Sequence, residues 1–221
     1  MPTSAERTPP VPSTRGRRPL GCRPRRLRVL REWLPLATVA FVILLARSSL
    51  ADHYVVPSGS MLPTVHEGDR VLVAKAAYGL RLPLTQQWLL ETAGPRRGEV
   101  VVLESPEDGI VLLKRVVALP GDEVTVRRGR LALGGLAVPT AVDERGVGIE
   151  LLDAGPHVVS VGDGGPDFGP AVVPPGHYLV MGDNRGDSKD GRMFGWVRRE
   201  AILGRAEAVY ARDGSLTWLE L

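Results

Sequence analysis

Residues 99–118, EVVVLESPEDGIVLLKRVVA, decide the fold of this 221-residue chain. Two aliphatic runs, 99–103 and 110–118, flank a segment that includes Pro106 and Gly109. Runs rich in Val, Ile and Leu that are bounded by turn residues are typical of β-strands. We therefore predict that the two runs pair as a hairpin and that the domain around them is mostly β.

Strand patterns continue on both sides of this hairpin. Further strands are predicted at 70–75, 123–128, 130–133, 176–181 and 206–212. Residues 134–175 are instead rich in Gly, Pro and Asp and contain only a short apolar run. Because these residue types favour turns, we predict an irregular cap there, within a cap subdomain at about 121–175.

The N-terminal part of the chain differs in composition. Residues 1–28 are rich in Pro, Arg, Ser and Thr, which predicts a disordered basic cytoplasmic tail. The run from Trp33 to Ala46 carries no charge, and its continuation to Ala51 reaches the roughly twenty residues that a membrane-spanning helix needs. We assign residues 29–52 to a single transmembrane anchor; a signal peptide and a buried core helix are the alternatives.

The flanks of this apolar run predict its orientation. Arginines that precede an apolar run keep the N-terminus in the cytoplasm, whether the run is cleaved or not. No clear A-x-A cleavage site follows the run, which favours an anchor over a signal peptide. Residues 53–221 would then form one extracytoplasmic domain at the outer membrane face.

Charge and cysteine content exclude several functions. Residues 1–32 hold nine arginines against two glutamates, or +7, and the whole chain carries +3, so the remainder carries −4. A nucleic-acid-binding domain is therefore not expected. Cys22 is the only cysteine, which excludes an internal disulfide and argues against a thiol nucleophile or a cysteine-based metal site.

A candidate serine nucleophile lies in residues 57–64, PSGSMLPT, shortly before the strand predicted at 70–75. Proline fixes φ and glycine permits close backbone approach, so we predict a rigid loop. A serine held on such a loop can present its hydroxyl and its own amide to one carbonyl group, as acyl transfer requires. The alternative is a polar turn that joins the membrane segment to the domain.

Two kinds of general base could serve such a serine. Four histidines are candidates although none lies in a recognisable catalytic signature: His53, His66, His157 and His177. The other candidate is Lys114, within the apolar run 110–118, where desolvation would lower its pKa and leave a free amine. Because side chains alternate across a strand, Lys114 or Arg115 could instead mark the solvent face.

The loop 182–192, GDNRGDSKDGR, is dense in polar groups. Arg185 falls where an EF-hand needs a ligand, and the loop lacks the G-x-S-x-G of a nucleophile elbow. We interpret it as a polar network that braces a site, with Ser188 orienting the lysine amine. In this interpretation Asp190 and Asp183 each pair with an arginine of the same loop, either Arg192 or Arg185. A solvated turn is the alternative.

Four segments, taken in order, resemble the boxes of bacterial type I signal peptidases. They are Pro57–Thr64, Gly68–Val73, Lys114–Asp122, and Gly182–Arg185 with Ser188, Asp190 and Arg192. The resemblance covers roughly residues 55–197, with the predicted anchor preceding it as in that family. The cap is covered only loosely.

The resemblance implies a mostly β peptidase with a Ser-Lys dyad and no metal or cofactor. Ser60 matches the nucleophile and Lys114 the general base, while the Ser58 hydroxyl and the Ser60 amide match the oxyanion hole. Ser188 matches the residue that orients the lysine. A supporting network is matched by Asp183, Asp190 and Arg192. The walls of the substrate pockets are matched by Val56, Met61 and Leu113.

The same resemblance separates this chain from close alternatives. Lys75 and Lys189 become solvent-facing lysines rather than bases, and Lys114 stands where the endoplasmic-reticulum branch has histidine. Two positions depart from the pattern: Gly186 replaces an acidic residue of many members, and Glu99 stands where Asp is common. Neither departure touches the dyad.

The sequence thus predicts an anchored, monomeric serine endopeptidase of the bacterial cytoplasmic membrane. It would remove signal peptides from secreted pre-proteins after small residues of the A-x-A type, with those peptides and the lipid bilayer as partners. One alternative is a self-cleaving Ser-Lys regulator, which would need a DNA-binding domain that the tail does not provide. The other is a catalytically inactive, membrane-tethered β domain that binds exported chains.

Overall fold

The structure is a computed structural model of the chain, and it describes residues 33–39, 51–81, 88–162 and 164–221. The chain divides into two units, residues 1–41 and 42–221, and residues 33–39 of the first form a short helix. None of the helices within the described ranges has the length and hydropathy needed to cross a membrane. The tail predicted at 1–28 and most of the anchor predicted at 29–52 lie outside the described residues.

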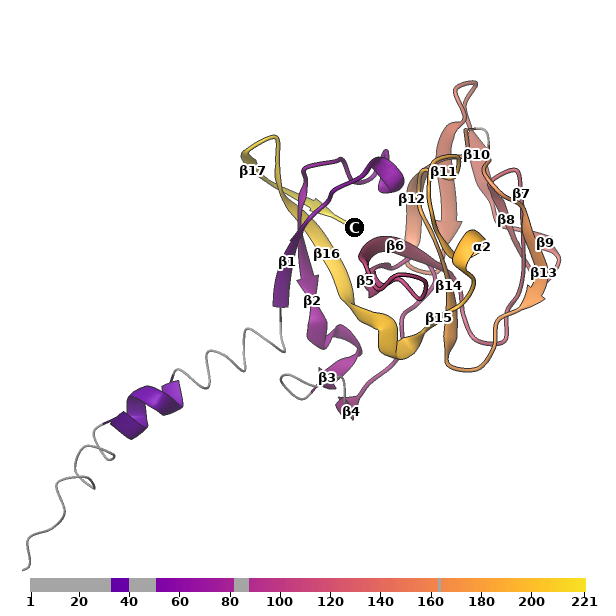
Figure 1. Cartoon of the computed structure of the whole chain (residues 1–221). Helices are drawn as coiled ribbons and strands as arrows, with labels where there is room; N and C mark the ends of the chain where they lie inside the picture. Colours follow the sequence, from indigo (N-terminus) through magenta and orange to yellow (C-terminus); the bar gives the residue numbers. More distant parts are fainter. Residues whose placement is uncertain (1–32, 40–50, 82–87, 163) are drawn as a thin grey trace, which may run out of the picture. The chain divides into compact units, whose positions relative to one another are not determined.

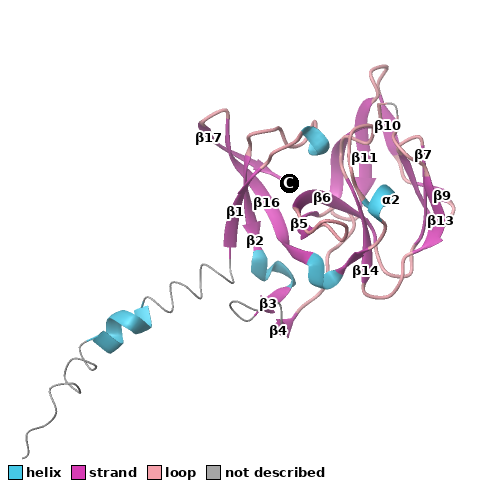
Figure 2. Cartoon of the chain, viewed as in Figure 1, coloured by secondary structure: helices cyan, strands magenta, loops and turns pink. Residues whose placement is uncertain are grey.

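The second unit is built around one antiparallel sheet that curls as it twists (Figure 1). Its strands lie in the order β1-β2-β16-β5-β6-β14-β15, and β17 pairs with β16. Their bounds are Ala51–Val55 (β1), Arg70–Ala74 (β2), Ile202–Arg212 (β16), Val100–Glu104 (β5), Val111–Ala118 (β6), His177–Met181 (β14), Val197–Arg198 (β15) and Ser215–Glu220 (β17). Strands dominate the unit, and its helices are short (Figure 2).

The predicted hairpin, β5 and β6, lies in the interior of this sheet, with Val101 opposite Lys114. Val100 and Val102 pack in one core cluster, and Val101 and Leu103 pack in another. Alternate residues face opposite sides of a strand, so an unbroken apolar run indicates a strand that is covered on both faces. The prediction of a mostly β domain is confirmed.

The cap corrects one prediction, because residues 134–175 are not irregular. The cap region contains two small sheets, β13-β7-β8-β9 and β10-β11-β12. The bounds are Glu123–Arg127 (β7), Arg130–Leu133 (β8), Leu136–Ala137 (β9), Thr140–Val142 (β10), Val147–Leu152 (β11), Gly155–Ser160 (β12) and Phe168–Val172 (β13). Many of the glycines lie at turns between short strands. Gly148 lies within β11 instead, and only glycine fits there, because a Cβ would lie 2.0 Å from the Ala141 carbonyl oxygen.

The remaining elements are short and connect the sheets. They are the strand pair β3 (Gly79–Arg81) and β4 (Trp88–Glu91), the 3₁₀ turns η1 (Gly59–Met61), η2 (Lys75–Tyr78) and η3 (Arg199–Ala201), and the single-turn helix α2 (Gly191–Phe194). Two of them overlap segments that the sequence singled out. η1 lies within the serine loop 57–64, and α2 begins at Gly191, near the end of the polar loop 182–192.

The burial of β5 predicts a large difference between two leucines. Leu103 is fully buried, whereas Leu216 on β17 is 88% exposed. Leu103→Ala is expected to lower the free energy of unfolding by about 2–5 kcal/mol, because it removes buried methyl groups and leaves a cavity. Leu216→Ala is the matched control and should change it by less than about 0.5 kcal/mol. Equilibrium denaturation of both variants measures this; equal losses would contradict the packing described.

Candidate active site

The serine loop 57–64 is closed at its base by backbone hydrogen bonds. Val56 N–H donates to Asp69 O at 2.9 Å, and Gly68 N–H donates to Val56 O at 2.8 Å. Beneath the loop, Met61 is fully buried in the core. These contacts hold η1 at the end of β1, and Ser60 lies half-buried within it.

Lys114 on β6 contacts Ser60 from 54 residues away in the sequence. Its Nζ donates to Ser60 Oγ at 2.6 Å, and Lys114 is only 2% exposed. Burial lowers the pKa of Lys114 to about 8. Asp190 and Asp183 raise this pKa and Arg192 lowers it, each by a smaller amount. A neutral amine is therefore well populated near pH 8, and a neutral amine can accept the Ser60 proton.

The neighbouring residue Arg115 is also buried, at 3% exposure. Lys114 and Arg115 point to opposite sides of β6, so neither side of the strand is open to solvent here. The alternative in which one of them marks the solvent face is wrong.

Ser58 lies beside Ser60. Its hydroxyl is 3.4 Å from Ser60 Oγ, on an exposed residue that precedes η1. This placement leaves both hydroxyls on the same side of the loop, where a carbonyl group could meet them.

The polar loop 182–192 holds the serine loop from the opposite side. Asn184 N–H donates to Ser60 O at 3.1 Å, and its side-chain Nδ2 donates to Gly59 O at 3.2 Å. Gly182 permits this approach, because a Cβ at that position would lie 2.4 Å from Ser60 O. The two loops therefore pack backbone against backbone.

Asp190 and Arg192 form a fully buried pair within this loop. Arg192 donates from Nε to Oδ1 at 2.9 Å and from Nη2 to Oδ2 at 2.8 Å. Asp190 Oδ2 also accepts from Gly182 N–H at 3.0 Å. A bidentate pair with an additional backbone donor satisfies both buried charges.

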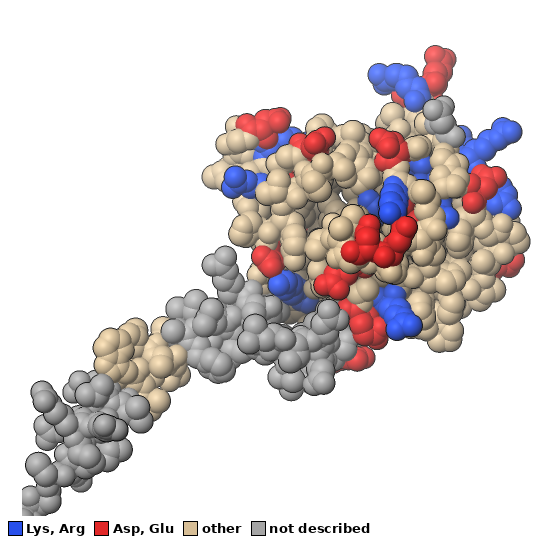
Figure 3. Space-filling view, viewed as in Figure 1, with Lys and Arg blue, Asp and Glu red and all other residues tan. Residues whose placement is uncertain are grey.

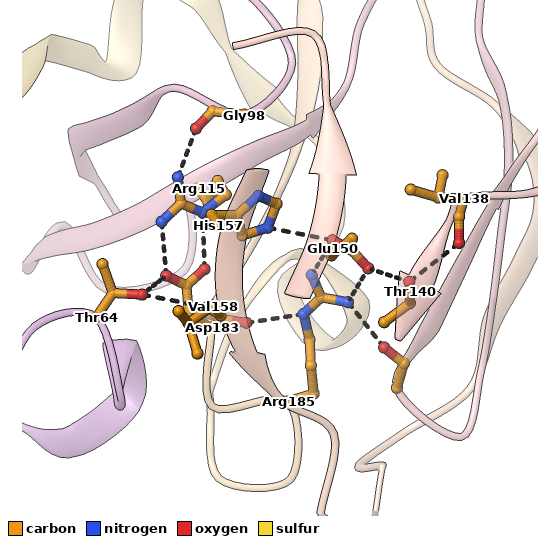
Figure 4. Close-up of polar contacts among 12 residues, drawn as sticks. Thr64, Gly98, Arg115, Val138, Thr140, Glu150, His157, Val158, Asp183 and Arg185 are labelled. Atoms are coloured by element: carbon orange, nitrogen blue, oxygen red, sulfur yellow. Dashed lines mark hydrogen bonds and ion pairs between the residues drawn. The ribbon is translucent and has the colours of Figure 1, made fainter. Parts of the chain in front are cut away.

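Asp183 pairs with an arginine that sequence reasoning did not offer as its partner. Arg115 donates from Nε to Oδ1 at 2.8 Å and from Nη2 to Oδ2 at 2.7 Å (Figure 4). Met181 lies opposite Arg115 in the β14–β6 ladder, which places Asp183 beside the guanidinium. The predicted choice between Arg185 and Arg192 as partners of Asp183 was therefore wrong, because the ladder brings a residue of another strand closer.

Thr64 joins the serine loop to this pair, donating from Oγ1 to Asp183 Oδ2 at 2.6 Å. Thr64, Arg115 and Asn184 are thus site residues to which the sequence analysis assigned no role. Their partners lie between 68 and 125 residues away, and no local pattern announces such contacts.

Ser188 is buried at 8% exposure, beside Gly182 and near Ser60 O. Its Oγ has no hydrogen-bond partner within the part of the chain that the structure describes. The lysine-orienting role of Ser188 stays a prediction.

An apolar groove of about 100 Å³ opens next to the serine loop between β1 and β6. Val56 and Leu113, two of the predicted substrate-binding residues, line it. Met61, the third, has no exposed surface and packs in the core, so its predicted direct contact with substrate is replaced by a packing role. The full lining is Tyr54, Val55, Val56, Pro57, Val71, Val102, Val111, Leu112 and Leu113.

The other candidate bases have different neighbours. His157 Nε2 lies 3.3 Å from Glu150, and His177 Nδ1 lies 2.9 Å from Pro175 O. Lys75 and Lys189 form partly exposed ion pairs with Asp52 and Glu107, each at 2.8 Å. Groups of both charge signs are interspersed in this way over the face drawn in Figure 3.

Comparison with known proteins identifies relatives of this chain. A family model described as "Signal peptidase, peptidase S26" matches residues 30–211. A signal peptidase I of Pseudomonas fluorescens is 38% identical over 196 residues, covering 78% of this chain and 69% of the relative. One from Pseudomonas aeruginosa is 35% identical over 195 residues, with the same coverage. A crystal structure of a signal peptidase I from Enterococcus faecalis is 25% identical, covers 52% of this chain and 98% of its own, and has a TM-score of 0.37.

The lowered pKa of Lys114 predicts a pH-dependent cost in stability. The folded-state pKa is about 8 against 10.5 for an ordinary lysine, so the unfolded chain binds more protons between these values and stability rises with pH across this window. Below pH 8 the folded protein holds a buried ammonium, at a cost of about 3 kcal/mol. Lys114→Met should therefore raise the free energy of unfolding at pH 7, and the gain should vanish above pH 10.5.

Lys189→Met serves as the control, because the ion pair with Glu107 raises the pKa of Lys189. Urea denaturation of both variants from pH 7 to above pH 10.5 measures the free energy of unfolding. A Lys114→Met gain that is independent of pH would contradict a buried, titrating amine.

Proposed function

The chain belongs to the signal peptidase family, peptidase S26, and is a serine endopeptidase; we propose that it removes signal peptides from secreted pre-proteins with a Ser60–Lys114 dyad. The observation that carries this proposal is the 2.6 Å contact between Lys114 Nζ and Ser60 Oγ at a buried amine of lowered pKa. A domain that only binds exported chains has no evident use for an uncharged buried lysine beside a serine hydroxyl.

In the proposed reaction, neutral Lys114 accepts the Ser60 proton as Oγ attacks the scissile carbonyl carbon. The oxyanion that forms accepts hydrogen bonds from the Ser58 hydroxyl and the Ser60 amide. The Lys114 ammonium then protonates the leaving amine, which departs as the N-terminus of the mature protein. Lys114 next takes a proton from the water that attacks the acyl carbonyl carbon and returns it to Ser60 Oγ as the ester bond breaks, which releases the signal peptide as a carboxylate and restores the neutral amine.

The buried ion pairs supply the electrostatic setting of the dyad. Asp183 and Asp190 favour the protonated amine, so each limits how far burial lowers the pKa of Lys114. Arg115 and Arg192 in turn neutralise these carboxylates. We assign Ser188 to orienting the Lys114 amine during turnover, since it is buried beside Gly182.

The small apolar groove accounts for the proposed substrate preference. Alternate residues of an extended peptide share a face, so the first and third residues before the cut would both face Val56 and Leu113. A groove of about 100 Å³ accommodates small side chains such as alanine. We therefore assign cleavage after A-x-A sequences.

The location of the reaction follows from the N-terminal sequence. We propose that the predicted anchor holds a monomeric enzyme in the bacterial cytoplasmic membrane, with residues 1–28 inside and the main sheet outside. The anchor ends by residue 50 rather than at 52, because Ala51 and Asp52 pair with β2 as the start of β1. Ser60 then follows the anchor by only a few residues and would lie near the lipid headgroups. A precursor's cleavage region emerges at the same depth.

Removal of either dyad member tests the mechanism. Ser60→Ala and Lys114→Ala should each lower kcat for a labelled Ala-x-Ala peptide in detergent by at least about a thousandfold, because nucleophile and base act as a unit. Circular dichroism checks that both variants fold, and Lys75→Ala is the matched lysine control. Full activity of folded Lys114→Ala would place the base elsewhere and return the histidines as candidates.

The pH profile provides a second test. Because Lys114 must be neutral to accept the proton, kcat/KM should fall as pH drops below its pKa of about 8 and level off above it. Well below this value the loss should be about tenfold per pH unit. Steady-state cleavage on both sides of pH 8 measures the profile, and a rate that stays flat at acid pH would rule out this base.

A further inference from the structure

The cap sheet is joined directly to the polar loop that holds the nucleophile. Ser160, the last residue of β12, forms a parallel bridge with Asn184. Ser160 N–H donates to Asp183 O at 2.9 Å, and Arg185 N–H donates to Ser160 O at 2.8 Å. The polar loop therefore continues the edge of the cap sheet.

Arg185 links this loop to two elements of the cap. Its side chain is fully buried, and its Nε donates to Gly182 O at 3.1 Å. Its Nη1 donates to Gly129 O, in the turn between β7 and β8, at 2.8 Å. The same guanidinium forms a bidentate pair with Glu150 of β11 (Figure 4). One side chain thus joins the catalytic loop to both cap sheets.

Glu150 is the anion that makes the burial of Arg185 possible. It is fully buried, and Nε2 of His157, its cross-strand neighbour on β12, lies 3.3 Å from the Oε2 atom that Arg185 Nη2 also contacts. Burial opposes ionisation of Glu150, but the contacts with His157 and Arg185 outweigh it and lower the pKa to about 2. Glu150 is therefore charged wherever the enzyme would work.

We propose that Glu150 is a positioning residue for the Ser60–Lys114 reaction, acting through Arg185 on the loop that carries Asn184 and Asp190. This inference rests on the mechanism proposed above. Glu150 fixes the guanidinium, and the guanidinium fixes Gly182 O. Gly182 N–H in turn donates to Asp190, and Asn184 donates to Ser60 O. The cap is then part of the catalytic apparatus.

Loss of the Glu150 charge should reach the dyad along this path. Arg185 would be left as a buried cation without its carboxylate, a state that side chains escape by moving toward water. The loop would move with it, loosening the Asn184 contact with Ser60 and admitting water to Lys114. Water at the amine would raise the Lys114 pKa toward that of an ordinary lysine.

The test uses the full chain in detergent with the Ala-x-Ala peptide. Folded Glu150→Gln should lower kcat at least about tenfold, since small misplacements of reacting groups are costly, with KM changed less than about twofold. The acid limb of its kcat/KM profile, which is the fall in rate toward low pH, should move up by about one pH unit as Lys114 becomes more accessible to water. Glu144→Gln, an exposed carboxylate of the same cap, is the matched control and should behave as wild type.

A purely structural role for Glu150 would lower stability without moving the acid limb. Folded Glu150→Gln with wild-type kcat and acid limb overturns the inference, and so does a change confined to KM. If this variant does not fold, Glu150→Asp keeps the charge but withdraws the carboxylate; its acid limb must move in the same direction, and an unmoved limb overturns the inference. If instead folded Lys114→Ala is active, the proposed dyad itself is refuted. If the wild type shows the acid limb and the Glu150 variants do not shift it, only the role of Glu150 is refuted.

Discussion

The rest of the site depends on one contact, that of a buried lysine amine with a serine hydroxyl. A charged ammonium is strongly stabilised by water, so an amine that must be neutral at work has to be kept from water by the fold. Lys114 achieves this on an interior strand whose two faces are both covered. The valine-rich β5 beside it and the serine loop above it therefore serve the proposed chemistry as well as the core.

Burial of an amine beside four other buried charges requires that each charge be balanced. Asp183 pairs with Arg115, and Asp190 pairs with Arg192. Both carboxylates stabilise the ammonium, while burial destabilises it more, which leaves the pKa of Lys114 lowered to about 8. The balance between desolvation and nearby carboxylates, rather than burial alone, thus determines the range of pH in which the amine is free.

The site is built where the main sheet meets the cap. The proposed nucleophile follows β1 and the proposed base lies on β6, whereas the polar loop between them runs on from β14 and bonds to β12 of the cap. Gly182 permits the loops to approach closely, and Asn184 joins them through one backbone and one side-chain hydrogen bond. Because serine and lysine come from different loops and strands, their separation depends on how well this junction is held.

The sequence by itself predicted β2, β5, β6, β14 and β16 of the main sheet and a rigid serine loop, because apolar runs and turn residues are local patterns; it missed β1, β15 and β17. The residues of the proposed dyad came from the resemblance of short motifs to a family, since the apolar run around Lys114 alone left the histidines open as bases. The sequence also indicated that loop 182–192 forms a charged network. Only the tertiary structure decided which charges pair: Arg115 with Asp183 and Arg185 with Glu150. It also showed that the cap consists of strands, which the sequence analysis missed because glycine-rich turns separate them. Such pairings depend on strand register and on contacts across more than thirty residues, and neither leaves a periodic trace in the sequence.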